Sequence, residues 1–178
     1  TDLVAEVPGI KDQVVLKPYP GASIQVNNNN FTDNTVMFAS ESFFKVFSFD
    51  LLMGSKEDVL KEPNSIVLSK SLSKKIFGND NPLGKTMVIH NKFKVTVTGI
   101  AENVTQNSHI KFDAVTSFST LMQIPGFVNN WRGNFSYHTY LLFENGTSQN
   151  TVKPKVTELF DEKLNDRDDE SAWVYEPI

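Results

Sequence analysis

The chain has 178 residues, of which 39% are hydrophobic and 21% charged, so it can bury a core and is not a disordered or collagen-like polypeptide. Its net charge of −4 and its two arginines, Arg132 and Arg167, exclude the basic surface typical of nucleic-acid-binding proteins. No stretch approaches the ~20 apolar residues that cross a bilayer, and the lack of cysteine excludes disulfides and thiolate chemistry. Because the sequence starts at Thr1 without a leader, we expect a mature product or an excised fragment.

Clusters of proline, glycine and asparagine divide the N-terminal part into short elements, which predicts a mixed α and β fold. The clusters are residues 8–9, 18–21 and 27–30. Residues 35–39 predict a strand, and residues 41–47 predict a short helix capped by Ser40. The phenylalanines of residues 43–49 are expected to hold these elements to the core rather than to line a ligand pocket.

The middle of the chain begins with a short apolar strand at residues 66–68. Ser69 is expected to cap a helix that runs through Phe77 and stops at Gly78. The buried stripe of this helix is predicted to be Leu72, Ile76 and Phe77.

A hairpin is predicted next, because residues 86–90 and 93–100 alternate apolar and polar side chains about a turn at Asn91. A third strand is predicted at residues 110–115. The spacing of apolar residues at 118–122 then predicts one or two helical turns before Pro125.

The C-terminal part predicts a strand at residues 137–143, a turn at Asn145-Gly146 and an amphipathic helix. Pro154 is expected in the first turn of this helix, the position where proline is tolerated. The predicted buried stripe is Val152, Val156, Leu159, Phe160 and Leu164. A last strand is predicted at residues 173–175.

Sequences that resemble active-site motifs fail on spacing or context. Gly78 and Gly84 have five residues between them, where a phosphate-binding P-loop has four, and a helix precedes them instead of a strand. Ser71 and Lys74 match Ser-x-x-Lys, but no Lys-Thr-Gly follows, and both residues lie on the predicted polar face of the helix. Neither nucleotide binding nor an acyl-enzyme is therefore expected.

The three histidines, His90, His109 and His138, lack the spacing of metal ligands, and no Gly-x-Ser-x-Gly elbow is present. The carboxylates of residues 161–170 lack the glycine and the spacing of a calcium loop. The sequence therefore assigns no catalytic, cofactor-binding or metal-binding residue, and no cofactor is expected.

The order of several segments resembles the extracytoplasmic domain of the MacB/FtsX-type permeases of ABC transporters. The strongest part, a structural signature, is the helix ending in Phe77-Gly78, the turn Pro82-Leu83-Gly84 and the hairpin that follows. The proline fixes φ in the turn and the glycine permits the reversal. The other segments that resemble this family are residues 7–10, 40–47, 51–54, 64–69, 95–100, 107–113, 131 and 137–143.

The resemblance implies an α+β fold with two lobes. A porter-like lobe would be built from both chain ends, residues 1–62 and 134–178, and an inserted Sabre-like lobe with a hairpin-containing sheet would comprise residues 63–133. In such permeases the domain lies between the first and second membrane helices, so both ends are expected to point at the bilayer.

The resemblance also implies a function: a non-catalytic domain in the periplasm that transmits ATP-driven movement from an inner-membrane permease to cargo or an envelope partner. The implied partners are a separate cytoplasmic ABC ATPase, a permease homodimer or paired permease, and an envelope adaptor or lipoprotein. No residue selects the cargo.

Two residues of the predicted linker, Phe127 and Trp131, are the candidates for a partner surface, although residues of this type are more often buried, here between the lobes. Two other functions stay open on the residues alone. An extracytoplasmic hydrolase or carbohydrate-binding module would have a deep pocket with convergent ionisable groups. A secreted binding protein that is complete as it stands would have polar flanking sequences.

Overall fold

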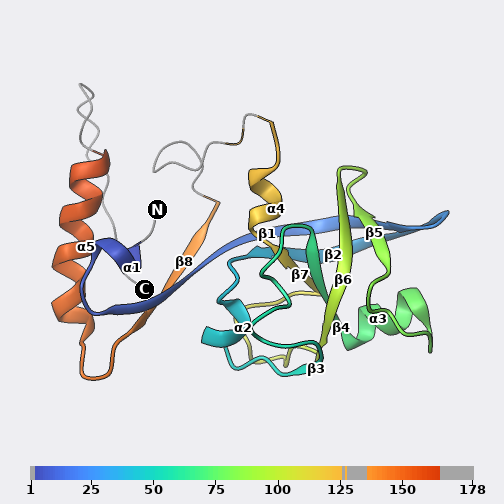
Figure 1. Cartoon of the computed structure of the whole chain (residues 1–178), viewed down its shortest axis with the longest axis horizontal. Coiled ribbons are helices and arrows are strands. Elements are labelled where there is room, and N and C mark those ends of the chain that lie inside the picture. The colour runs from blue at the N-terminus through green and yellow to red at the C-terminus, as the bar shows by residue number, and fades with distance from the viewer. Residues whose placement is uncertain (1–2, 126, 128–135, 165–178) are drawn as a thin grey trace. The chain divides into compact units, whose positions relative to one another are not determined.

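The computed structural model describes residues 3–125, 127 and 136–164 (Figure 1), which form two compact units. The end unit contains residues 3–13 and 141–164 of the described chain, and the ring unit contains residues 14–125, 127 and 136–140. The predicted α+β class is confirmed. The assignment of residues 1–62 and 134–178 to a porter-like lobe and of 63–133 to a Sabre-like lobe stays a prediction.

Helices and strands alternate irregularly along the chain. The elements are α1 (Leu3–Glu6), β1 (Ile10–Val26), β2 (Asn29–Ala39), α2 (Phe43–Val46), β3 (Leu51–Met53), β4 (Ser65–Ser69), α3 (Lys70–Phe77), β5 (Thr86–Ile89), β6 (Phe93–Ala101), β7 (Ala114–Ser117), α4 (Ser119–Met122), β8 (His138–Phe143) and α5 (Gln149–Leu164). Within the described ranges, no helix is both long and apolar enough to span a membrane.

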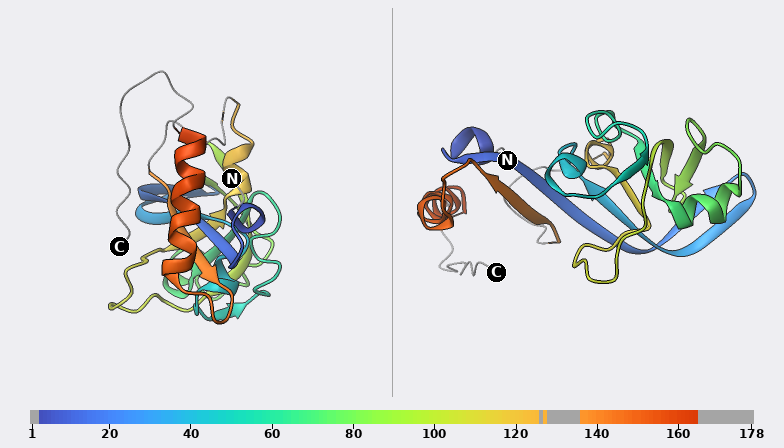
Figure 2. Two further views of the ribbon diagram at one scale, coloured as in Figure 1. Left: turned by 90° about the vertical axis from the view of Figure 1, so that its left-hand side faces the viewer. Right: turned by 90° about the horizontal axis from the view of Figure 1, so that it is seen from below.

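Six strands of the ring unit form a closed sheet in the order β2-β7-β4-β6-β5-β1, because β1 also pairs with β2. Figure 2 shows the long blue hairpin of β1 and β2 from two further sides. Pairs β2–β7 and β4–β6 are parallel, and the other four pairs are antiparallel. The ring closes at the end of β1, where Ile24 lies opposite Ile89 and Gln25 lies opposite Val88. β3 pairs with β6 outside the ring.

The inner face of this closed sheet is buried, and the outer face is buried in part. One apolar cluster, the interior cluster, takes residues from all six strands, which can meet only inside the ring. Alternate residues of β2 show the division: Val36 and Phe38 belong to the interior cluster, whereas Met37 and Ala39 belong to an outer cluster with α2 and the loop before β7. Both faces of the sheet are therefore buried along β4 and at residues 36–39 of β2.

The long hairpin of β1 and β2 is absent from the sequence-based prediction, which places a break at residues 18–21 instead of a strand. The structure places Pro20 and Gly21 of β1 at a bulge, where the register with β2 shifts between Tyr19 and Ala22, while Pro18 stays in the ladder opposite Met37. A bulge leaves residues outside the ladder, so Pro20 does not remove a hydrogen bond that the sheet needs.

Helix α3 matches its prediction in position and in both caps. The Leu72 N–H donates to the Ser69 Oγ at 3.2 Å, and Gly78 follows the last helical residue. Leu72 is buried, and Ile76 and Phe77 pack partly buried against the interior cluster.

Replacing Ser69 with alanine should lower the free energy of unfolding by about 1 kcal/mol, because the Leu72 N–H then loses its acceptor at a buried helix start. Urea unfolding measures the change. The matched control is Ser71→Ala, which removes an exposed hydroxyl from the same helix and should change the midpoint little. Equal losses in the two variants would show that the cap contributes no stability.

Three local predictions are wrong. Ser40 does not cap α2; its Oγ accepts the Val15 N–H at 2.8 Å and so joins α2 to β1. The strand predicted at residues 110–115 lies instead at Ala114–Ser117, because Ile110 and Phe112 are buried from a loop and their apolarity is no sign of a strand. Pro154 lies beyond the first turn of α5, since the helix begins at Gln149.

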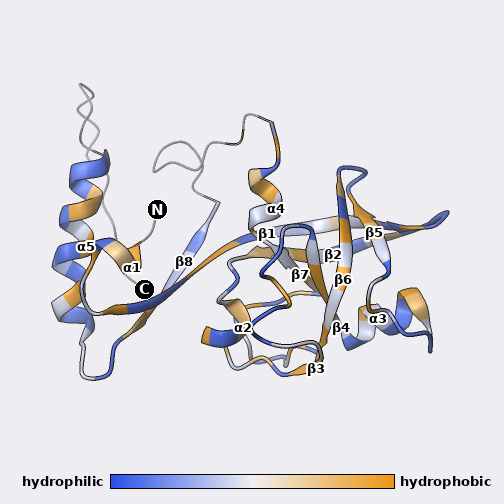
Figure 3. Ribbon diagram, in the orientation of Figure 1, coloured by the Kyte–Doolittle hydropathy of each residue, from blue (hydrophilic) through white to orange (hydrophobic). Residues whose placement is uncertain are grey.

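The end unit holds α1, α5 and the pairing of β8 with β1. The predicted apolar stripe of α5 is confirmed for its described side chains: Val152 and Val156 are buried and Leu159 and Phe160 pack beside them. Figure 3 shows the apolar bands between hydrophilic ones along this helix. The cluster is completed by Leu3, Val7, Ile10, Leu141 and Phe143. The strand predicted at 173–175 lies outside the described residues.

Candidate functional site

The predicted signature forms the connection between α3 and β5. α3 ends at Phe77, and Gly78 reverses the chain with a φ of +63°. Pro82 is buried, Leu83 packs against the interior cluster, and the Leu83 N–H donates to the side-chain oxygen of Asn81 at 3.1 Å. The turn is therefore closed by its own side chain and by the core beneath it.

Gly84 and Lys85 tie this turn to β6. The Gly84 N–H donates to the Val97 carbonyl at 2.8 Å, and the Val97 N–H donates to the Lys85 carbonyl at 2.9 Å. The Lys85 ammonium lies 3.1 Å from an Asp80 carboxylate oxygen and 4.9 Å from the centre of the Phe77 ring. These contacts suit the predicted role of setting the angle at which the hairpin leaves α3, and none supplies a reacting group.

Replacing Gly84 with alanine should lower the free energy of unfolding by about 1–2 kcal/mol, because its φ of +75° is unfavourable for a residue with a Cβ. No atom lies within 4 Å of the position that the Cβ would take, so the loss comes from the backbone alone. Gly84→Asn should cost less, since asparagine tolerates this conformation. Thermal unfolding compares the two, and an equal or larger loss for asparagine would contradict this account.

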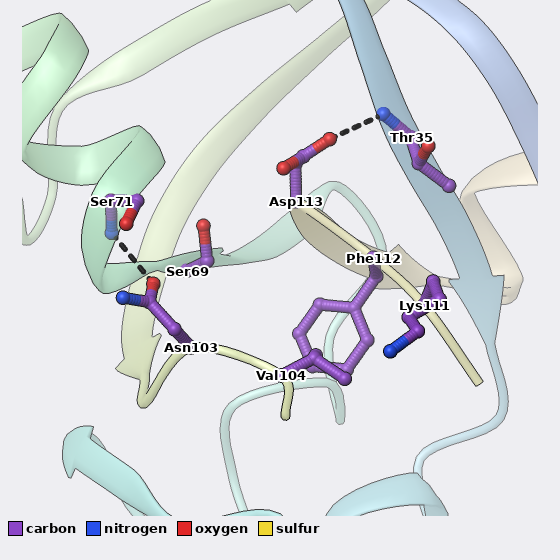
Figure 4. A pocket seen from close by; sticks show the side chains of 8 residues that line it. All are labelled: Thr35, Ser69, Ser71, Asn103, Val104, Lys111, Phe112 and Asp113. Atoms are coloured by element: carbon purple, nitrogen blue, oxygen red, sulfur yellow. Dashed lines mark hydrogen bonds between the residues drawn. The ribbon is translucent and has the colours of Figure 1, made fainter. Parts of the chain in front are cut away.

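A polar hollow of about 320 Å³ lies beside the start of α3 (Figure 4). Its lining residues come from β2, the β4–α3 junction and the segments on either side of the loop before β7: Thr35, Ser69, Ser71, Asn103, Val104, Lys111, Phe112 and Asp113. The Asp113 carboxylate accepts the Thr35 N–H at 2.7 Å, and the Asn103 side-chain oxygen accepts the Ser71 N–H at 2.9 Å. The side chains that could bind a ligand thus bind the main chain of neighbouring elements.

The Lys111 side chain also binds the main chain. Its ammonium donates to the Thr105 and Gln106 carbonyls, each at 2.6 Å, and so closes the loop that leads to the hollow. The main chain of Asp113 adds two bonds, from the Ser69 N–H to its carbonyl and from its own N–H to the Thr35 carbonyl, both at 2.8 Å. Lys111 and Asp113 therefore have a positioning role that the sequence did not indicate beyond placing both in residues 107–113.

The residues of the motifs rejected above lie outside the polar hollow, except for Ser71. Ser71 and Lys74 are exposed on α3, and none of the three histidines lines the hollow. His109 Nε2 lies 3.2 Å from the Tyr140 hydroxyl, and His90 stacks edge-on against Tyr19 at 4.5 Å between ring centroids. In the part of the chain that the structure describes, no group of three or more His, Asp or Glu side chains could hold a metal ion.

One member of the predicted partner surface is described. Phe127 is half-buried and lies edge-on against Phe118, with 6.4 Å between ring centroids, beside the interior cluster. Phe118 also contacts Tyr137, whose hydroxyl pKa is raised by burial and whose ring lies 4.6 Å from the Lys17 ammonium. Trp131 lies outside the described residues, so the partner surface of Phe127 and Trp131 stays a prediction.

Comparison with known proteins identifies the chain. The family model described as MacB-like periplasmic core domain matches residues 2–159. The chain belongs to this family. The curated MacB relative, a macrolide export ATP-binding/permease protein of Aggregatibacter actinomycetemcomitans, is 37% identical over 81 residues, which are 44% of this chain and 12% of the relative. The matched segment thus covers only about an eighth of that protein's length, and the match confirms the resemblance given above.

Solved structures show the same fold for MacB-like domains. A domain assigned to a permease protein from Porphyromonas gingivalis has a TM-score of 0.76 at 22% identity, over 92% of this chain and 75% of that one. The periplasmic region of MacB from Actinobacillus actinomycetemcomitans has a TM-score of 0.68 at 24% identity, over 89% and 70%. The extracellular domain of the ABC-type transporter YknZ from Gram-positive bacteria has a TM-score of 0.64 at 18% identity, over 89% and 79%.

Proposed function

We propose that this MacB-like domain is a non-catalytic, extracytoplasmic part of an ABC transporter permease, and that it passes ATP-driven movement of the membrane helices to cargo or to an envelope partner. The observation that carries the proposal is the match of the family model to residues 2–159. In the proposal, ATP is hydrolysed by a cytoplasmic ATPase, the permease acts as a homodimer or with a related permease, and the domain lies in the periplasm.

The structure of the ring unit suits a rigid body that moves as a whole. Each of its six ring strands has a neighbour on both sides over part of its length, and a close-packed apolar interior resists smooth deformation. A rigid part transmits a displacement instead of absorbing it. This property supports a mechanical role, in which the side chains around the polar hollow serve to hold β2, β4 and β7 together.

The end unit supports the second part of the proposal, in which the membrane helices pass their movement to this domain. It contains both α1 and α5, near the two ends of the described chain, and they share one apolar cluster. The Lys163 ammonium also lies 3.9 Å from a Glu6 carboxylate oxygen. With membrane helices before and after the domain, as the family resemblance implies, both would act on the same compact unit.

The experiment is a distance measurement in the full-length permease, reconstituted in nanodiscs with its ATPase. A spin label at Lys94→Cys on β6 of each permease subunit reports the distance between the two domains. We expect this distance to change by several ångströms between the nucleotide-free state and the state trapped with ATP and vanadate. The matched control is a pair of labels at Lys74→Cys and Lys94→Cys within one subunit, which both lie exposed on the ring unit and should keep their separation.

ATP hydrolysis without any change in the distance between subunits would overturn the mechanical role. A change in the control distance would contradict the rigid ring unit while leaving movement itself established. The two parts of the proposal are thus tested separately.

A further inference from the structure

Another hollow of the ring unit, the hairpin hollow, lies between the end of the β1–β2 hairpin and the turn that joins α3 to β5. Its volume is about 490 Å³, within the rough range of 300–1,000 Å³ that small-ligand sites occupy. Its lining residues belong to residues 26–31 and 76–86, all of which the structure describes, and none of them lines the polar hollow beside α3.

Strand β5, which forms one wall, directs alternate main-chain groups to its two neighbours, β6 and β1. The residues that flank β5 show which groups face which neighbour. The Lys85 carbonyl accepts the Val97 N–H of β6 at 2.9 Å, and the His90 N–H donates to the Ser23 carbonyl of β1 at 2.9 Å. Odd-numbered residues of β5 therefore bond to β6, and even-numbered residues face β1.

The ladder between β1 and β5 is shorter than β5 itself. It ends where Gln25 lies opposite Val88. The next even-numbered residue of β5, Thr86, would face Asn27, but Asn27 lies in the β1–β2 turn with a φ of +54° and pairs with no strand. Thr86 lines the hairpin hollow, so its N–H and C=O are directed toward the hollow instead of toward a strand.

Two side chains add groups of the same chemical kind. Asn27 and Asn29 line the hairpin hollow, and each carboxamide combines N–H donors with a carbonyl acceptor, as a peptide group does. In the part of the chain that the structure describes, neither of these carboxamides is hydrogen-bonded, unlike Asn103 and Asp113 in the polar hollow. With the main chain of Thr86, they offer paired donors and acceptors that suit a ligand made of amide groups.

The rest of the lining is apolar or carries no net charge. The apolar part consists of Phe31, Ile76 and Phe77, which are half-buried and pack against the interior cluster. Asp80 and Lys85 are the charged lining residues, and they form an ion pair at 3.1 Å, so their charges cancel. This part of the hollow therefore suits an uncharged apolar group.

We propose that the hairpin hollow binds a short extended peptide segment of a partner or cargo. Its main chain bonds to Thr86, Asn27 and Asn29, and one uncharged apolar side chain packs on the phenylalanine rings. Strand addition of this kind takes affinity from main-chain hydrogen bonds and selectivity from a side-chain pocket. The hollow thereby adds a binding site to a domain whose proposed role is mechanical, and neither proposal depends on the other.

A sugar is the other uncharged ligand that is rich in donors and acceptors, but it would stack on the faces of the aromatic rings. Ammonium groups already lie over both rings: Lys75 is 6.0 Å from the centre of the Phe31 ring, and Lys85 is 4.9 Å from the centre of the Phe77 ring. The structure therefore favours the peptide.

NMR titration of the 178-residue protein tests the proposal. The probes are blocked, uncharged pentapeptides, Ala-Ala-X-Ala-Ala, in which X is leucine, valine or phenylalanine. We expect at least one of them to shift the Thr86 amide and the Asn29 side-chain amide resonances saturably, with a Kd of about 1 mM or lower. The peptide with X as aspartate should bind about tenfold or more weakly, because the carboxylate would lose its hydration among apolar groups.

The matched variants are Asn29→Ala and Asn30→Ala, at consecutive positions of β2 that are both exposed, of which only the first lines the hollow. Asn29→Ala should weaken binding of the best peptide about fivefold or more, whereas Asn30→Ala should change it less than about twofold. Thermal unfolding should give both variants the midpoint of the unaltered protein, since neither side chain is buried.

Three outcomes would overturn the proposal: no saturable shift with any of the uncharged peptides, equal weakening by the two variants, or saturable shifts with the neutral disaccharide maltose and none with peptide. The last would assign the hollow to a sugar. None of them bears on the distance measurement in the full-length permease, so failure here is distinct from failure of the mechanical role.

Amide hydrogen exchange in the free protein checks the main-chain part without any ligand. The Met87 N–H, which bonds to β6, should exchange about 100-fold or more slowly than the Thr86 N–H, which faces the hollow. Equal protection of the two would show that the Thr86 N–H is already bonded, and would overturn the proposal.

Discussion

Phe43→Ala should lower the free energy of unfolding by about 3–5 kcal/mol, one of the two largest losses that we expect in this domain. Phe43 has no exposed surface, and its ring lies 4.9 Å from Phe44, 5.3 Å from both Phe47 and Phe49, and 5.8 Å from Phe112, measured between centroids. Removing it leaves a cavity between α2 and the loop before β7 and takes away ring contacts on four sides. Urea unfolding monitored by circular dichroism measures the loss.

The matched control is Phe31→Ala. Phe31 is only half-buried near the start of β2, so its removal should cost clearly less than that of Phe43. A small loss for Phe43→Ala, similar to the loss for Phe31→Ala, would contradict its assignment to the core. It would reopen the alternative, set aside on sequence grounds, that these phenylalanines line a ligand pocket.

The sequence predicted well those elements that are determined by residues close together in the chain. Ser69 and Gly78 bound α3 because a hydroxyl acceptor and a residue that tolerates positive φ act within one helical turn. The β5–β6 hairpin follows from alternation about the tight turn in which His90 and Asn91 adopt φ values of 49° and 53°. These features do not depend on which strand lies beside them.

Long-range contacts account for what the sequence did not predict. The prolines of residues 18–21 argue locally against a strand, yet β1 continues through them. Pro20 lies at a bulge outside the ladder with β2, and Pro18 stays in register opposite Met37. Closure of the ring depends on Ile24 meeting Ile89, two residues that carry no mutual signal along the chain. The α+β class and the family were therefore predictable, while the closed sheet was not.

The candidate site also contains one part that the sequence predicted and one part that it did not. The signature from Phe77 to Gly84 could be named from the sequence because its turn is local. The roles of Lys111 and Asp113 could not, since each depends on main-chain groups that the fold brings to it, such as the Thr35 N–H. Polar residues that bind main chain look the same in a sequence as polar residues that bind a ligand.

Gly54→Ala should lower the free energy of unfolding by about 3 kcal/mol, because two penalties coincide at one position. Gly54 has a φ of +94°, which is unfavourable for any residue with a side chain. An added Cβ would also meet Val59 Cγ1 and lie 2.8 Å from the Thr98 carbonyl oxygen. Neither neighbour can move freely: Val59 is buried, and the Thr98 hydroxyl donates to the Val59 carbonyl at 2.6 Å.

Gly21→Ala separates the two penalties. Gly21 also has a positive φ, +69°, but no atom lies within 4 Å of the position that an added methyl group would take, so only the backbone cost of about 1–2 kcal/mol should appear. A double-mutant cycle with Val59→Ala then isolates the steric part, because Gly54→Ala should cost less once the valine methyls are gone. An additive cycle, with Gly54→Ala no more harmful than Gly21→Ala, would show that the contact between β3 and the Val59 segment relaxes without loss. Coupling in the expected direction would establish that β3 is held against β6 by close packing at a site where only glycine fits.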